Sequence, residues 1–326
     1  MTSIDAEHRA GTFVPHGFEE HTADLGEIRM NYVVAGDAGR PALLLVPGQT
    51  ESWWGYEQAL PLLAEHFQAY AVDLRGQGRS SWTPGRYTLD NMGSDLVRFI
   101  DLVIGRPALV SGLSSGGVLA AWLSAYAKPG QVHGAVYEDP PLFASETRPA
   151  CGPSIRQGMG PVFALWSKWL GDQWSVGDWA GALGAMLREV PPVLLDGLAA
   201  MAGAQPPPSG AEPPQNLKEY DPEWARAFVT GSVSAGCDHA AMLANVRVPV
   251  LFTHHYRRID PATGHLLGAI ADHQAQYVRQ LVEAAGQPFT YRSFPQMPHS
   301  MHGSDPGLYA RTVTDWASAL PEPHHR

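Results

Sequence analysis

The sequence predicts an α/β fold: a doubly wound, mostly parallel sheet interrupted by an inserted helical region. Two observations carry this prediction. Apolar segments of strand length alternate with segments of helical periodicity up to residue 141 and again after residue 240. Such alternation is typical of a parallel sheet with helices on both faces. Residues 142–240 break the alternation and are rich in tryptophan, proline and glycine.

Seven segments have the character of strands. Most are continuous apolar runs, such as "PALLLVPG", and this is the pattern of strands buried on both faces. Several of them stop at glycine or proline, which mark turns. The expected strands lie at 28–36, 41–48, 67–76, 107–115, 132–141, 248–255 and 288–295.

Five further segments have helical spacing or helix-end signals. In "TLDNMGSDLVRFIDLVIG", Thr88 or Asp90 suits the start of a helix, and Gly105 suits its end. The expected helices lie at 56–66, 88–105, 116–130, 266–285 and 307–319. We therefore expect three regions, namely a first part of the core at 1–141, a helical cap insertion at 142–240 and a second part of the core at 241–326.

Composition excludes several classes of function. The 326 residues carry a net charge of −10, which argues against nucleic acid or an anionic membrane surface as the main partner. Cys151 and Cys237 are too few for a disulfide scaffold, and no zinc-ligand spacing occurs. We see no signal peptide and no apolar segment of membrane length, so we expect a soluble cytoplasmic protein.

The turn "GLSSG" at 112–116 fits the pattern G-x-S-x-G, with a buried strand before it and a helix after it. In a nucleophile elbow this pattern lifts a serine above the sheet, and the glycines let backbone pack on backbone. The spacing selects Ser114, because Ser115 would need glycine at position 113, which is leucine. Ser115 instead supplies the first helical N–H, aimed where an oxyanion would form.

A second motif, "DLRGQGRS" at 73–80, completes a series with "LLLVPG" and "GLSSGG" that resembles the α/β-hydrolase superfamily, in its serine hydrolase branch. The resemblance implies the α/β-hydrolase fold, a structural role for residues 73–80, and neither a metal nor an organic cofactor. It also implies a second oxyanion N–H in the loop after the strand at 41–48, where the residue is Gln49. The dehalogenase and epoxide-hydrolase branches have aspartate at the position of Ser114.

The same resemblance places a catalytic histidine late in the chain, ahead of a helix that begins P-x-x-(aromatic). The segment "FPQMPHSMHGSDPGLYA" offers His299 and His302. The usual gap to Pro306 favours His299. His302 is then a neighbour of the pocket or an exposed residue.

Three carboxylates compete to be the third member, which orients the histidine. Glu138 is the expected residue, because it lies 24 residues after Ser114, as in relatives that carry an acid there. Asp260 occupies the commoner location, after the penultimate strand. Asp139 is favoured instead when the count starts from Val132.

The substrate is inferred from the tryptophans. "FALWSKWLGDQWSVGDWA" contains four of them, and we expect Trp166 to line an apolar wall, with Trp53 or Trp54 as a roof. Such a wall suits a bulky hydrophobic ester or lactone. An "SSG" elbow with an acid after the strand before the insertion is similar to zearalenone-hydrolase-type lactonases, which open a macrolactone.

The leading hypothesis is therefore a serine hydrolase that cleaves a carboxylic ester or lactone through an acyl-enzyme. A carbon–carbon bond hydrolase and a cofactor-free perhydrolase are alternatives on the same scaffold. A non-catalytic small-molecule receptor is a further alternative, which turnover of aryl esters would exclude. The only partner expected is the small hydrophobic substrate, and a homo-oligomer is compatible with the sequence.

Overall fold

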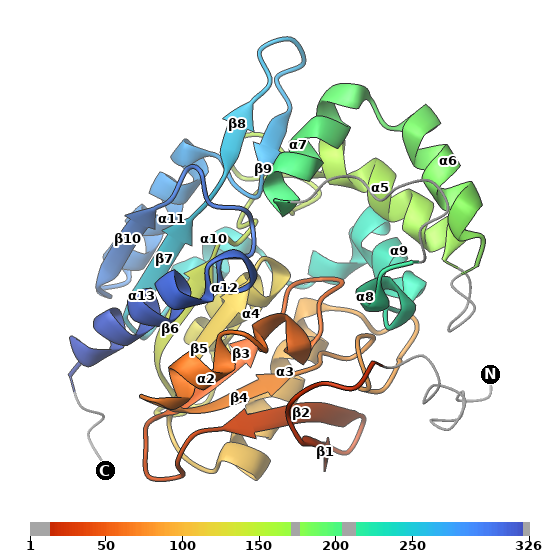
Figure 1. The fold of residues 1–326 in the computed structure, drawn as a ribbon. Helices are drawn as coiled ribbons and strands as arrows, with labels where there is room; N and C mark the ends of the chain where they lie inside the picture. The colour runs from red at the N-terminus through yellow and green to blue at the C-terminus, as the bar shows by residue number, and fades with distance from the viewer. Residues whose placement is uncertain (1–13, 171–176, 204–212, 322–326) are drawn as a thin grey trace.

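The computed structural model describes residues 14–170, 177–203 and 213–321 (Figure 1). Within them an eight-stranded sheet has the order β1-β2-β4-β3-β5-β6-β7-β10. β1, β2 and β4 pair antiparallel in turn, and the other pairs are parallel. A separate antiparallel pair, β8 (Arg257–Ile259) and β9 (Leu266–Gly268), lies outside this sheet. The strands of the sheet are β1 (Glu20–Asp24), β2 (Arg29–Ala35), β3 (Ala42–Val46), β4 (Gln68–Val72), β5 (Ala108–Leu113), β6 (Val132–Glu138), β7 (Val250–His254) and β10 (Phe289–Ser293).

Helices connect the strands and continue beyond the last one. None of the helices in the described ranges has both the length and the apolar character that a bilayer-spanning segment needs. The helices of the alternating regions are α2 (Leu60–Ala64), α3 (Leu89–Phe99), α4 (Ser115–Tyr126), α10 (His239–Leu243), α11 (Asp272–Ala284), α12 (Met301–Ser304) and α13 (Pro306–Ser318). The 3₁₀ turns are η2 (Trp53–Tyr56) and η4 (Ser232–Ser234), and the π-helical turn η3 (Ile100–Ile104) follows α3.

The predicted fold class is confirmed, since every expected strand is present and the sheet is mostly parallel. The short strands β1, β8 and β9 were not predicted. The helix expected from residue 266 begins only at Asp272, because residues 266–268 form β9. A short apolar run cannot be assigned to strand or helix by periodicity alone.

Both faces of the sheet are covered, which explains the continuous apolar runs. Side chains alternate along each strand. Leu44 and Val46 of β3 pack in the larger core with α3, α4 and α11, whereas Leu43 and Leu45 pack in a second core with α2 and α13. Because β3, β5, β6 and β7 run parallel, their carboxyl ends lie at the same edge of the sheet. Open α/β sheets bind their ligands at this edge.

Between β6 and β7 the described chain is mainly helical. Figure 1 shows these helices grouped beside the sheet, with the β8–β9 hairpin next to α7. A small apolar cluster, including Val162, Leu194 and Leu267, joins this group to the hairpin. The division at residues 142 and 240 stays a prediction, and Trp174 lies outside the described residues. The helices are α5 (Arg156–Trp169), α6 (Trp179–Glu189), α7 (Pro192–Ala202), α8 (Gln215–Lys218) and α9 (Pro222–Thr230).

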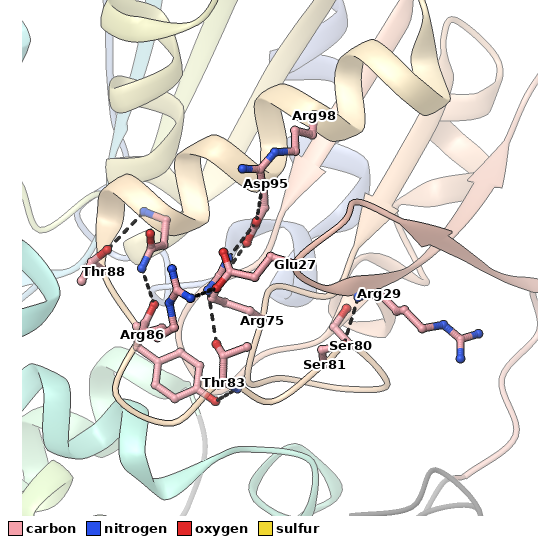
Figure 2. A network of polar contacts seen from close by, with 12 residues as sticks. Glu27, Arg29, Arg75, Ser80, Ser81, Thr83, Arg86, Thr88, Asp95 and Arg98 are labelled. Atoms are coloured by element: carbon pink, nitrogen blue, oxygen red, sulfur yellow. Dashed lines mark hydrogen bonds and ion pairs between the residues drawn. The ribbon is translucent and has the colours of Figure 1, made fainter. Parts of the chain in front are cut away.

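The loop that carries "DLRGQGRS" is held by a buried ion pair (Figure 2). Arg75 donates two hydrogen bonds to Asp95 of α3, at 2.7 and 2.8 Å, and both side chains are buried. Glu27 contacts the same guanidinium at 3.3 Å, and Thr83 accepts from it at 3.3 Å. Fork-like pairing of this kind adds geometric specificity. Within the described residues, the contacts of Arg75 are those expected of a structural loop.

Candidate active site

Ser114 lies in a strained turn between β5 and α4. Its φ of 55° and ψ of −119° are unusual for a residue with a side chain, and such strain is found most often at functional sites. The neighbouring glycines make the turn possible. A Cβ at Gly112 would lie 2.1 Å from the carbonyl oxygen of Gly116, and one at Gly116 would lie 2.3 Å from that of Val46. The spacing that selected Ser114 therefore has a steric cause.

His299 follows β10, and its side chain pairs with Asp139. The His299 Nδ1 donates to Asp139 Oδ2 at 2.6 Å. Asp139 Oδ1 accepts the backbone N–H of His255 at 3.0 Å, so both oxygens of this buried carboxylate are used. The expectation that Glu138 orients His299 is wrong. The Glu138 carboxylate instead accepts from His302 Nδ1 at 2.8 Å.

The direction of the two neighbouring acids follows from β6. Glu138 is the last residue of the strand and pairs in register with Leu113. Because side chains alternate along a strand, Glu138 lies on the same face as Val136, which belongs to the second core. Asp139 lies just beyond the strand with a φ of 42°. This left-handed conformation is tolerated by aspartate and directs the side chain off the strand end. The count from Val132 was the signal that pointed to Asp139.

Burial and charge act in opposite directions on this pair. Burial favours the neutral form of Asp139, but the neighbouring His255 and His299 outweigh it and lower the pKa of Asp139. Burial likewise disfavours the imidazolium of His299, but the hydrogen bond and charge of Asp139 raise the pKa of His299 above its ordinary value. Asp139 therefore stabilises the protonated form of His299. A histidine that acts as general base needs this stabilisation after it has accepted a proton.

Asp260 serves its own hairpin. Its Oδ2 accepts from the backbone N–H of Thr263 at 2.9 Å, and from the hydroxyl of the same residue. Such local contacts are typical of aspartate in turns. Asp260, the second of the three carboxylates considered for the orienting role, therefore belongs to the β8–β9 connection.

Comparison with known proteins agrees with this geometry. Residues 43–312 match the alpha/beta hydrolase family. This chain belongs to that family. The match spans the elbow, the loop at 73–80 and the His299 segment.

Similar hydrolases differ in their reactions. A 3-oxoadipate enol-lactonase from Acinetobacter baylyi is 31% identical over 100 residues, covering 30% of this chain and 37% of that protein. Epoxide hydrolase 4 from Mus musculus is 32% identical over 104 residues, covering 31% and 29%. The matched segments thus span about a third of these relatives' lengths. The crystal structure of the enol-lactonase from Burkholderia xenovorans LB400 superposes with a TM-score of 0.64 at 17% identity, covering 91% of this hydrolase and all of that chain.

The predicted oxyanion donors of the hydrolase are the backbone N–H groups of Ser115 and Gln49. Ser115 opens α4, so its backbone N–H is one of the unpaired donors of the first turn. The other donor, Gln49, follows Gly48, and a Cβ at Gly48 would lie 3.4 Å from the Ser114 Cβ. The Gln49 side chain donates to the Tyr220 hydroxyl at 2.6 Å. The closeness of Gly48 to Ser114 places the Gln49 loop beside the elbow. The oxyanion role of both residues stays a prediction.

The three tryptophans expected in the pocket have different surroundings. Trp53 is 1% exposed and belongs to the second core, and its backbone N–H donates to Asp73 at 2.7 Å. Trp54 is half-buried and stacks on the His16 ring. Trp166 is half-buried and packs edge-on against Phe163, with 5.0 Å between the ring centroids. Trp53 is thus a core residue, and a pocket role for Trp54 and Trp166 stays a prediction.

A pocket with apolar lining adjoins the His299 segment. It lies between α5, α7 and β9. The backbone N–H of His299 donates to the carbonyl of Met201, one of the lining residues, at 2.7 Å. This pocket could not be predicted from the sequence, because α5, α7 and β9 meet only in the folded chain. The lining residues are Ile155, Gly158, Met159, Leu194, Gly197, Leu198, Met201, Leu266, Leu267 and Gly268.

Proposed function

We propose that this α/β-hydrolase cleaves a carboxylic ester or lactone with a bulky apolar group, using Ser114, His299 and Asp139. The observation that carries the proposal is the hydrogen bond from His299 to the buried Asp139, at the same sheet edge as the strained Ser114. A buried aspartate that orients a histidine beside a serine elbow is the arrangement of serine hydrolases.

The reaction begins when Ser114 Oγ attacks the acyl carbon and His299 accepts the hydroxyl proton. Asp139 holds the imidazole in the required tautomer and stabilises its protonated form. No hydrogen bond joins Ser114 Oγ to His299 in the described residues. Such contacts are often long before substrate binds and shorten in the complex. Substrate binding would therefore bring the two groups into reach.

The tetrahedral intermediate carries its negative charge on the former carbonyl oxygen. The backbone N–H groups of Gln49 and Ser115 would stabilise this charge, helped by the N-terminus of α4. Collapse breaks the bond to the alkoxide, which takes the proton from His299. Water then gives a proton to His299 and attacks the acyl carbon. The bond from that carbon to Ser114 Oγ breaks as His299 returns the proton to Oγ, which releases the acid and restores Ser114.

Two features support an apolar substrate. The pocket beside His299 is lined by aliphatic side chains and glycine. Trp166 is half-buried and adds aromatic surface among the helices between β6 and β7. Pockets of this kind bind ligands mainly by apolar burial, with few polar contacts for orientation. A macrolactone such as zearalenone is one compound that fits this description.

A substrate panel tests the proposal. The wild-type protein would be assayed with aryl esters of increasing acyl length and with lactones of increasing ring size, zearalenone included. We expect turnover that rises with apolar size, and covalent labelling of Ser114 by a fluorophosphonate. Turnover of epoxides without ester hydrolysis, or labelling elsewhere in the chain, would contradict the proposal.

A further inference from the structure

A second histidine–carboxylate cluster lies beside the candidate site, and the chemistry proposed above does not use it. His302 is fully buried between two acids. Its Nδ1 lies 2.8 Å from Glu138 Oε2, and its Nε2 lies 3.1 Å from Glu51 Oε1. The Tyr56 ring stacks on the imidazole with 3.8 Å between ring centroids. We call Glu51, His302 and Glu138 the buried triad.

The two acids favour a positive charge on His302. A carboxylate oxygen only accepts hydrogen bonds, so His302 satisfies both acids when each ring nitrogen donates one, and only the imidazolium has two donors. The Ser300 hydroxyl also lies 3.2 Å from His302 Nε2. Burial favours the neutral ring, but the charges of Glu138 and Glu51 outweigh it and raise the pKa of His302 to about 10. The cation therefore persists at neutral pH.

Each acid of the triad also accepts backbone N–H groups, Glu51 within its own loop and Glu138 from the His299 segment. Glu51 Oε2 accepts the N–H of Gly48 at 3.1 Å, next to the predicted oxyanion donor Gln49. Glu138 Oε1 accepts the N–H of Met301 at 2.8 Å and that of His302 at 3.2 Å. Both acids thus need every oxygen as an acceptor.

The backbone of Glu138 extends these links to the elbow. Its carbonyl accepts the N–H of Ser114 at 2.9 Å, and its neighbour in the chain is Asp139. One buried cluster therefore connects the Gly48–Gln49 loop, the elbow and the His299 segment. Those are the three parts of the site that must be aligned for acyl transfer.

We propose that the buried triad is a positioning device, which holds the Gly48–Gln49 loop at the distance from Ser114 and His299 that oxyanion stabilisation requires. This rests on the proposed function, since Gln49 matters as an oxyanion donor only there. The triad does not touch the substrate. It acts through the position of the loop. It therefore stabilises the transition state, which raises kcat, and does not strengthen substrate binding.

A conservative substitution tests this device. Glutamine has one acceptor and one donor in its side-chain amide, so Glu51→Gln can keep only one of the two contacts. The matched control is Glu57→Gln. Glu57 also accepts from one histidine and one glycine, namely from His16 Nδ1 at 2.9 Å and from the Gly17 N–H at 2.7 Å. Neither partner belongs to the Gly48–Gln49 loop.

Kinetics separate positioning from plain stability. Removing one oxyanion donor costs about 10²–10³ in kcat in a well-studied protease. For a displaced donor we expect Glu51→Gln to lower kcat about 10- to 100-fold, with KM within about twofold, and Glu57→Gln to change neither. A wild-type kcat in Glu51→Gln, or a rise in KM alone, would overturn the inference.

Hydrogen exchange provides a readout that needs no activity. Glu138→Gln changes a residue that does not contact Gly48, yet the triad should transmit the change. We expect the Gly48 amide to exchange at least about tenfold faster in Glu138→Gln, while the amides of β3 keep their rates. Unchanged Gly48 exchange would overturn the inference even if the esterase assays succeed. If those assays fail for the wild type, only the proposed function fails, and exchange still decides whether the triad holds the loop.

Discussion

Asp139 Oδ2 lies 2.6 Å from His299 Nδ1, although the neighbouring Glu138 is the acid that chain spacing favours. The two carboxylates are adjacent in sequence and serve different histidines. Their substitutions should therefore have different effects on catalysis.

Asp139→Asn should lower kcat about 10³- to 10⁴-fold, because an amide can no longer accept from both His255 and His299 and favours the wrong tautomer. Glu138→Gln should cost less, about 10- to 100-fold, because it disturbs only the positioning of the site. Steady-state hydrolysis of an aryl ester measures both. Equal losses in the two variants would contradict the assignment of Asp139.

Ser114→Ala should reduce ester hydrolysis by at least about 10⁴-fold, because it removes the attacking oxygen. Ser115→Ala should retain activity within about tenfold, since Ser115 acts through its backbone N–H. The buried Ser115 hydroxyl has no hydrogen-bond partner among the described residues, so its removal breaks no polar contact. A reversed order of the two activities would exclude Ser114 as the nucleophile.

The pH dependence should reveal the Asp139–His299 pair. His299 must be neutral to accept the serine proton, so kcat/KM should rise with pH through the pKa of His299. Burial lowers the pKa of His299, but Asp139 raises it by more than burial lowers it. The midpoint should therefore lie above the ordinary value of 6.5. Asp139→Asn should move the midpoint to lower pH. A midpoint that stays in place would show that Asp139 does not set it.

Arg75→Ala should destabilise the fold, because it leaves the buried Asp95 with only the long contact to Arg98. Breaking a buried pair typically costs roughly 3–5 kcal/mol. Arg98 contacts the same carboxylate at 3.4 Å, but its side chain is 44% exposed. Arg98→Ala should therefore cost less than about 1 kcal/mol. Urea unfolding of the two variants provides the comparison, and similar midpoints would contradict the structural role of Arg75.

Gly112→Ala should strain the elbow, because the new Cβ would lie 2.1 Å from a backbone oxygen. Overpacking of this kind typically costs about 1–3 kcal/mol. The control is Gly39→Ala, since a Cβ at Gly39 would have no atom within 4 Å. Thermal unfolding should show a lower Tm for Gly112→Ala alone. A Tm equal to that of the control would mean that the turn can relax.

Much of the fold could be predicted because the relevant signals are local. Continuous apolar runs separated by glycine and proline mark the buried strands. The β8–β9 hairpin could not be predicted, because strands of three residues depend on their pairing partner. The pocket between α5, α7 and β9 likewise exists only through long-range packing.

Glycine spacing alone was enough to predict which serine occupies the elbow, because that turn leaves no room for a Cβ at Gly112 or Gly116. The sequence also pointed to His299 as the histidine of the site, and His299 is the residue that pairs with Asp139. The choice between Glu138 and Asp139 was decided only by the tertiary structure. A step of one residue at a strand end reverses the side-chain direction, and here β6 register and the positive φ of Asp139 set that direction.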